Sequence, residues 1–289
     1  MKKLLAIVIS MAMVVAMVPM SVFATNEPVA NCENGSSCTT HEAAIGTTHY
    51  GTLQEAINAG DGKTIELIRD VILRDTLTIS SGTITLDLNG KTITATKKSD
   101  EKKVCNIYVS GSADLTIKGN GYISGPNDDD CAALDTKALI NVEGTNAKLT
   151  VLNGTITAGG KNRDGMYGIY VLDGGNVTLG NSEGGPTIET WFAAVGENNT
   201  TSPANITIEN GIYTQRANPV SGSNVSASSH LYAAVYASAS GTINIKGGTF
   251  TGYYGVSSNY KNVNQNINIS GGTFNPNYSR VLDVNEFTL

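Results

Sequence analysis

Apolar and polar residues alternate in short segments along most of the chain, and these segments recur at a similar interval. Each copy has an apolar residue, a Thr or Asn and another apolar residue, and a corner ending in Asn-Gly or Gly-Gly follows. Because side chains on a strand alternate between its two faces, the apolar pair lies on one face and the polar residue on the other. Glycine accepts the positive φ of a sharp corner, so the pattern predicts short strands separated by tight turns. The copies are Ile84-Thr85-Leu86, Leu115-Thr116-Ile117, Leu149-Thr150-Val151, Val177-Thr178-Leu179, Ile206-Thr207-Ile208, Ile243-Asn244-Ile245 and Ile267-Asn268-Ile269.

The order of strand and corner types predicts the fold class. Successive corners are 24 to 37 residues apart, and a second apolar column precedes each later copy. The members of this column are Ile107/Val109, Ile140/Val142, Ile169/Val171, Ala193/Val195 and Ala233/Val235. One such unit cannot bury its own apolar face and must stack on neighbours. We therefore expect an all-β, right-handed parallel β-helix of roughly seven to eight coils, and an antiparallel β-sandwich is the competing interpretation.

A short helix is expected before the first coil. Thr52-Leu53-Gln54-Glu55 has the spacing of a capping box, and Gly60 is a stop signal. Such a helix covers the open end of a solenoid, whose strand edge otherwise invites aggregation. We assign residues 49–63 to this capping region and residues 64–289 to the β-helix, and the sequence leaves open whether the β-helix is complete at its C-terminal end.

The N-terminus is typical of a secretory signal peptide, which we assign to residues 1–24. Two lysines precede an apolar stretch from Leu4 to Val18, and Val22-Phe23-Ala24 supplies the small residues of a cleavage site. The alternative, a membrane anchor, needs a span of about 20 apolar residues, and this stretch is shorter. We expect a secreted or cell-surface protein with no membrane span in the mature chain.

Export makes disulfides the expected fate of the four cysteines. Cys32 and Cys38, in the segment 25–48, enclose a flexible loop and are predicted to pair. The alternative is a metal site with His41 and His49, although the spacing fits no established zinc signature. For Cys105 and Cys131 the sequence leaves pairing open.

Composition excludes several classes of protein. The net charge is −6, 40% of residues are hydrophobic and only 15% are charged. The apolar fraction is large enough to form a core, which argues against a disordered chain. The acidic balance argues against a nucleic-acid partner, because binding to nucleic acid is driven by basic side chains that release counterions from the phosphates.

The segment His49 to Ile57, with the later Ile-x-Ile-x-Gly-Gly-Thr-Phe units, resembles the pectate-lyase-like right-handed β-helix regions of secreted and surface proteins from Gram-positive bacteria. The resemblance covers about residues 41–280. It implies the fold and, more weakly, an adhesin-like or carbohydrate-associated role.

The resemblance implies no catalytic residues here. Pectin-cleaving hydrolases of this fold would need paired acids near Gly-His-Gly and Arg-Ile-Lys segments, and neither triplet occurs. The run Asp128-Asp129-Asp130 could offer oxygen ligands to Ca²⁺, or it is a solvated loop. We expect no other cofactor.

Aromatic residues are the better candidates for ligand contact. Trp191, Tyr253, Tyr254 and Tyr260 could lie against sugar rings, although tyrosine also packs in coil interiors. The sequence thus favours a non-catalytic interaction module, adhesin-like or carbohydrate-binding, with a glycan or a host or cell-surface protein as partner. The alternatives are a polysaccharide lyase or glycoside hydrolase, and a structural spacer with a flat Thr/Asn face. Ice binding by that face is a weaker option, because Thr is a good strand former anyway.

Overall fold

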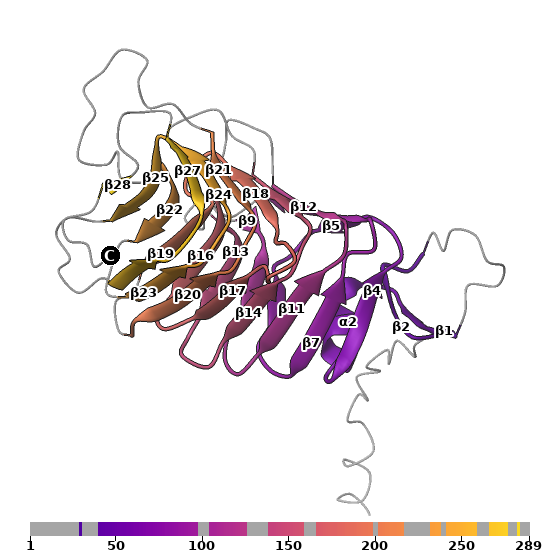
Figure 1. Ribbon diagram of the computed structural model, residues 1–289. Coiled ribbons are helices and arrows are strands. Elements are labelled where there is room, and N and C mark those ends of the chain that lie inside the picture. Colours follow the sequence, from indigo (N-terminus) through magenta and orange to yellow (C-terminus); the bar gives the residue numbers. More distant parts are fainter. Residues whose placement is uncertain are drawn as a thin grey trace, which may run out of the picture.

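Three long sheets, composed mostly of parallel strands, run side by side along the molecule. The computed structural model describes residues 29–30, 40–97, 104–125, 138–158, 166–198, 202–216, 232–237, 241–258, 266–276 and 282–283. Within these ranges the chain winds from one sheet to the next and returns one strand further along, so each coil contributes a strand to each sheet (Figure 1). This arrangement is the expected parallel β-helix.

The strands are grouped by sheet. Sheet A contains β1 (Val29–Ala30), β3 (Thr48–Tyr50), β2 (Ala43–Ile45), β4 (Lys63–Leu67), β7 (Thr83–Asp87), β11 (Asp114–Lys118), β14 (Lys148–Val151), β17 (Asn176–Leu179), β20 (Ala204–Ile208), β23 (Gly241–Ile245) and β26 (Asn266–Ile269). Sheet B contains β5 (Val71–Leu73), β8 (Thr92–Lys97), β12 (Tyr122–Ser124), β15 (Thr155–Thr157), β18 (Thr187–Thr190), β21 (Ile212–Gln215), β24 (Thr249–Gly252) and β27 (Thr273–Pro276), with β9 (Val104–Cys105) paired to β8. Sheet C contains β6 (Leu77–Ile79), β10 (Ile107–Val109), β13 (Ala138–Glu143), β16 (Tyr167–Leu172), β19 (Val195–Asn198), β22 (Ala233–Ala237), β25 (Tyr254–Ser258) and β28 (Leu282–Asp283).

Equivalent positions of the repeat stack in register in sheet A. Thr85 pairs with Thr116, and the column continues without a slip to Asn268. The expected Thr/Asn face is therefore confirmed, while the aliphatic residues on either side of each Thr or Asn face the interior. Asn268 donates to Asn244 at 2.9 Å, so the polar column also links neighbouring coils.

The core is one continuous cluster of inward-facing aliphatic residues from all three sheets. Toward the C-terminal coils, sheet B contributes an aromatic stack in place of isoleucine. The ring centroids of Tyr213 and Phe250 are 5.1 Å apart, and those of Phe250 and Phe274 are 4.8 Å apart. Gly248 lies at the corner with φ +105°, where a Cβ would come within 3.3 Å of both the Phe250 and Tyr213 rings. The corner glycine thus supplies both the turn and the space for the stack.

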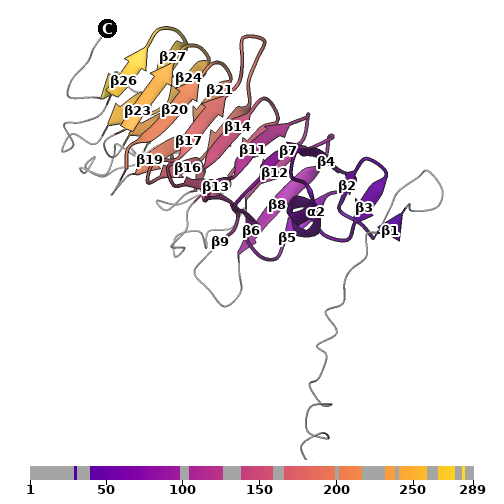
Figure 2. The same cartoon turned by 90° about the horizontal axis from the view of Figure 1, so that it is seen from below.

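The N-terminal end of the solenoid is covered as the sequence predicts. The helix α2 (Leu53–Ala59) begins with a capping box formed by Thr52 and Glu55. It lies at the indigo end of the molecule, next to β6 (Figure 2). The Gln54 amide accepts from the Thr78 backbone N–H and donates to the Thr78 carbonyl, both at 2.9 Å. This side chain takes the place of a neighbouring strand and satisfies part of the edge of sheet C.

The expected second column of apolar residues is correct except at two positions. Ala193 and Ala233 belong to clusters outside the core, and Ala194 and Ala234 face the interior instead. The reason is a break in alternation at the start of these strands, because consecutive residues such as Ala194 and Val195 both pack inward. The break turns the preceding position toward the outside of sheet C.

Replacing Phe250 tests the interior stack. Phe250→Ala removes a fully buried ring with stacked neighbours on both sides, so we expect the free energy of unfolding to fall by about 3–5 kcal/mol. Thr251→Ala, on the outer face of the same strand, is the control and is expected to change it by less than about 0.5 kcal/mol. Chemical denaturation followed by circular dichroism measures both, and equal losses would contradict the assignment of Phe250 to the core.

Candidate functional site

The outer face of sheet C carries a column of polar and aromatic residues, one from each coil. The register aligns Thr78, Tyr108, Asn141, Tyr170, Gly196, Tyr236 and Ser257. We call these seven residues the outer column. Their strand neighbours, such as Ile169 and Val171 beside Tyr170, belong to the core. Because side chains alternate along a strand, the outer column projects away from the core.

Five aromatic side chains gather around the middle of this column. We call Tyr167, Tyr170, Phe192, Tyr232 and Tyr236 the aromatic face, since they pack in a hydrophobic cluster separate from the core. Tyr167 stacks on Tyr170 with 4.6 Å between ring centroids, and Phe192 lies 5.8 Å from Tyr167 and 5.7 Å from Tyr232. Tyr167 and Tyr236 are each 8% exposed, whereas Tyr170 and Tyr232 are more accessible.

Gly196 makes room for this stack. A Cβ on Gly196 would come within 2.9 Å of two Tyr167 ring carbons and within 3.3 Å of Tyr170. Its neighbour Val195 faces the core, so Gly196 is the position of β19 over which the rings lie. A side chain here would displace the Tyr167 ring.

Polar atoms without partners flank the aromatic face in the same column. Asn141 is 6% exposed and Ser257 is 0% exposed. The Asn141 Oδ1 and Ser257 Oγ atoms are buried and have no hydrogen-bond partner, a state shared among the described side chains only by His49 Nδ1. Unpaired buried polar atoms are uncommon because each costs stability, so two in one column call for a functional explanation.

A tyrosine and a carboxylate lie beside Asn141. The Tyr108 hydroxyl donates to Glu143 Oε2 at 2.7 Å. Desolvation, followed by the hydrogen bond to Glu143 and by its charge, raises the pKa of Tyr108 to about 12. Both side chains are partly exposed, so this pair is accessible from solvent.

Burial also raises the pKa of three tyrosines of the aromatic face, Tyr167, Tyr170 and Tyr236. Desolvation, with smaller effects from Tyr170 and Glu197, raises the pKa of Tyr236 to about 12. The pKa of Tyr170 is raised by desolvation and by Glu197, and a hydrogen bond from Asn198 opposes the rise. Glu197 itself is fully buried and in register with Val171 and Ala237. These three hydroxyl groups therefore stay neutral further into alkali than an ordinary tyrosine, whose pKa is about 10.

The aromatic residues proposed from the sequence lie close to this face but differ in exposure. Tyr253 and Tyr254 are buried, form an edge-to-face pair at 4.8 Å and belong to a cluster that Tyr232 joins to the aromatic face. Trp191 is partly exposed at the corner between β18 and β19, where its carbonyl accepts from Gln215 Nε2 at 2.9 Å. Tyr260 lies outside the described residues.

Sequence reasoning missed Tyr167, Tyr170 and Asn141. A signal for two of them was present, because Ile107-Tyr108-Val109, Ile140-Asn141-Val142 and Ile169-Tyr170-Val171 share one alternation. Aligning these triplets as repeats places Tyr108, Asn141 and Tyr170 in a single outward column. Tyr167 carried no such signal, because it lies beyond the break in alternation.

The other predicted sites fall mostly outside the part of the chain that is described. This holds for Asp128, Asp129 and Asp130, for the Cys32 and Cys38 pair, and for Cys131. Within the described ranges, no three His, Cys, Asp or Glu side chains lie close enough together to hold a metal ion. The same ranges contain no helix long and apolar enough to cross a membrane. The Ca²⁺ site and the Cys32–Cys38 disulfide remain predictions, and the pairing of Cys105 with Cys131 remains open.

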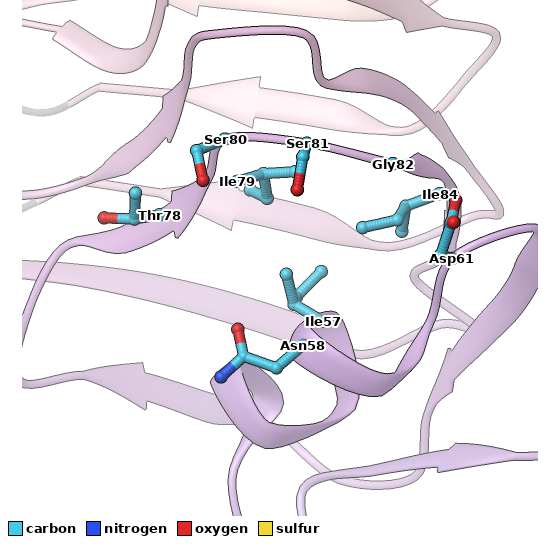
Figure 3. A pocket seen from close by; sticks show the side chains of 9 residues that line it. All are labelled: Ile57, Asn58, Asp61, Thr78, Ile79, Ser80, Ser81, Gly82 and Ile84. Atoms are coloured by element: carbon cyan, nitrogen blue, oxygen red, sulfur yellow. The ribbon is translucent and has the colours of Figure 1, made fainter.

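A hollow of about 300 Å³ lies between α2 and the corner that leads from β6 to β7 (Figure 3). Isoleucines from the helix and from coil strands form part of its wall, and Asn58, Asp61 and Ser80 are among its polar residues. Asp61 Oδ1 already accepts from the Thr83 backbone N–H at 2.8 Å, and Asn58 Oδ1 accepts from Gln54 Nε2 at 3.0 Å. Both oxygens are therefore engaged in hydrogen bonds within the cap or between the cap and the first coil, and we assign the hollow to the N-terminal cap and not to a binding site.

Comparison with known proteins identifies no relative of this chain. No family model matches the chain, and neither a curated protein nor a solved structure matches it.

The raised tyrosine pKa values predict a loss of stability in alkali. Tyr108 and Tyr236 titrate at about 12 in the native state, against about 10 when unfolded. The native state thus binds their protons more tightly. This contribution to stability is complete below about pH 10 and is lost as the pH rises through about 12.

Denaturation at a series of alkaline pH values measures this loss. The double variant Tyr108→Phe, Tyr236→Phe is expected to lose stability less steeply between about pH 10 and 12 than the parent, since phenylalanine does not ionise. Parallel curves for the two proteins would refute the protonation argument.

Proposed function

We propose that this protein is an exported, non-catalytic binding module of the cell exterior, adhesin-like in role, which holds a glycan on the outer face of sheet C. Export rests on the signal-like residues 1–24. The choice of a glycan rests on the aromatic face together with the unpaired polar atoms beside it.

One observation carries the proposal. Tyrosine rings and unpaired hydrogen-bonding atoms occupy the same outward column, outside the core that stabilises the fold. Sugars offer apolar ring faces and many hydroxyl groups, so they match a surface that combines aromatic rings with polar atoms. Residues needed only for stability would pair their polar atoms, as the Asn268 amide does with Asn244.

Sheet C also differs from the two other outer faces. The outer face of sheet A is a column of Thr and Asn with ion pairs such as Lys118 to Asp87 at 3.2 Å. The outer face of sheet B is mainly Thr, with single exposed residues such as Tyr122 and Ile212. A plain spacer has no need of three different faces, and this contrast favours a binding role for sheet C.

The proposal is tested with the chain lacking its first 24 residues on a glycan array, with and without EDTA. The same sample is incubated with uronate and neutral polymers and assayed for new reducing ends and unsaturated products. Binding without product release supports the proposal. Product release would replace it with a lyase or hydrolase, and capture of a surface protein without any glycan would replace the ligand class.

The aromatic face is tested by truncating its two more accessible rings. We expect Tyr170→Ala and Tyr232→Ala each to lower affinity for the captured glycan by about tenfold or more, because central aromatic contacts dominate binding energy. Tyr122→Ala is the matched control, since Tyr122 is 51% exposed on sheet B, and it should leave affinity unchanged. Equal effects of all three variants in isothermal titration calorimetry would argue against the aromatic face.

A further inference from the structure

We infer that the glycan is an uncharged chain of several sugar residues, which lies along the outer column parallel to the solenoid axis and donates hydrogen bonds to it. The inference rests on the proposed function and specifies its ligand class. Three properties of sheet C support it: its charge, the kind of hydrogen-bonding atoms that are unpaired, and their separation.

The charge of sheet C disfavours an acidic ligand. The strands that the structure describes in this sheet contain no Lys, Arg or His, whereas the partly exposed Glu143 lies on the outer face, two residues from Asn141. Basic residues lie on the strands of the other sheets, for example Lys118 and Lys148 in sheet A and Lys97 in sheet B. A uronate chain on sheet C would bring carboxylates next to Glu143 without a cation from these strands to offset the repulsion.

The unpaired atoms call for hydrogen-bond donors. Asn141 Oδ1 is only an acceptor, and the Ser257 hydroxyl oxygen has accepting capacity as well. The Glu143 carboxylate accepts one hydrogen bond from Tyr108 and has lone pairs to spare. Sugar hydroxyl groups are donors and would satisfy all three without introducing charge. A carboxylate of the ligand could accept from the Ser257 O–H, but it could satisfy neither Asn141 Oδ1 nor Glu143, which both need a donor.

The separation of the two unpaired atoms sets the length of the ligand. From Asn141 the register passes through Tyr170, Gly196 and Tyr236 to Ser257, which makes four steps between neighbouring strands. At about 4.8 Å per step the two ends are about 19 Å apart. Both atoms are buried in the absence of a ligand, so binding has to displace the residues that cover them. A ligand that then reaches both and crosses the tyrosines between them is an extended oligosaccharide. A mono- or disaccharide would reach one end only.

The test compares polymers of different charge and oligosaccharides of different length. Immobilised xylan, mannan, galactan and mixed-linkage β-glucan are the neutral probes, and polygalacturonate, alginate and hyaluronan are the acidic probes. We expect capture by at least one neutral polymer and by none of the acidic ones. For the neutral polymer that binds, its hexasaccharide should bind at least tenfold more tightly than its disaccharide.

Two variants locate the ligand on the outer column. Ser257→Ala and Asn141→Leu each remove an unpaired buried polar atom, so the thermal midpoint should stay the same or rise. Affinity for the hexasaccharide should fall at least fivefold in each. Ser124→Ala, on the outer face of sheet B, is the control and should change neither quantity.

The outcomes separate the inference from the proposed function. Capture by the acidic polymers, or equal affinity for disaccharide and hexasaccharide, would overturn the inference and leave glycan binding standing. Full affinity of Ser257→Ala and Asn141→Leu would overturn the placement along the outer column. Capture by none of the seven polymers, together with no binding on the glycan array, would overturn the proposed function itself.

Discussion

The structure depends on stacking equivalent residues one coil apart, in register. A single coil has three short strands and cannot shelter its aliphatic side chains, so it is stable only when it packs against neighbouring coils or, at the N-terminal end, against α2. Backbone hydrogen bonds between parallel strands fix the spacing at about 4.8 Å, and the buried aliphatic columns fix the register, since a slip by one residue would turn them outward. The glycine corners, the aromatic stack of Phe250 and the Thr/Asn column all follow from this constraint.

The same constraint produces surfaces of different chemistry. Because each outward position is repeated once per coil, whatever residue type recurs there becomes a column along the molecule. In sheet A the recurring type is Thr or Asn, and neighbours such as Asn244 and Asn268 bond to each other. In sheet C tyrosines recur, and Asn141 and Ser257 keep unpaired atoms among them. In the first arrangement the polar side chains satisfy one another, whereas the unpaired atoms of the second support the proposed ligand site.

The sequence predicted the features that depend on local pattern. The register of sheet A, the capping box at Thr52 and the outward Thr/Asn column follow from alternation, side-chain spacing and corner chemistry, and the structure confirms them. The face of sheet C could be predicted only in part. Its alternation breaks at positions such as Ala194, and contacts such as Tyr167 over Gly196 join residues 29 positions apart, which no local pattern encodes. The hydrogen bonds between the Gln54 amide and the Thr78 backbone are likewise tertiary contacts that no local pattern encodes.

The register is measured most directly by pulsed electron resonance between spin labels at positions 85 and 244, outward positions of sheet A that are five coils apart. At about 4.8 Å per coil, stacking in register predicts one narrow distribution centred near 24 Å, broadened only by the label side chains. A broad or multiple distribution, or a distance that does not scale when the second label moves to position 207, would contradict the account.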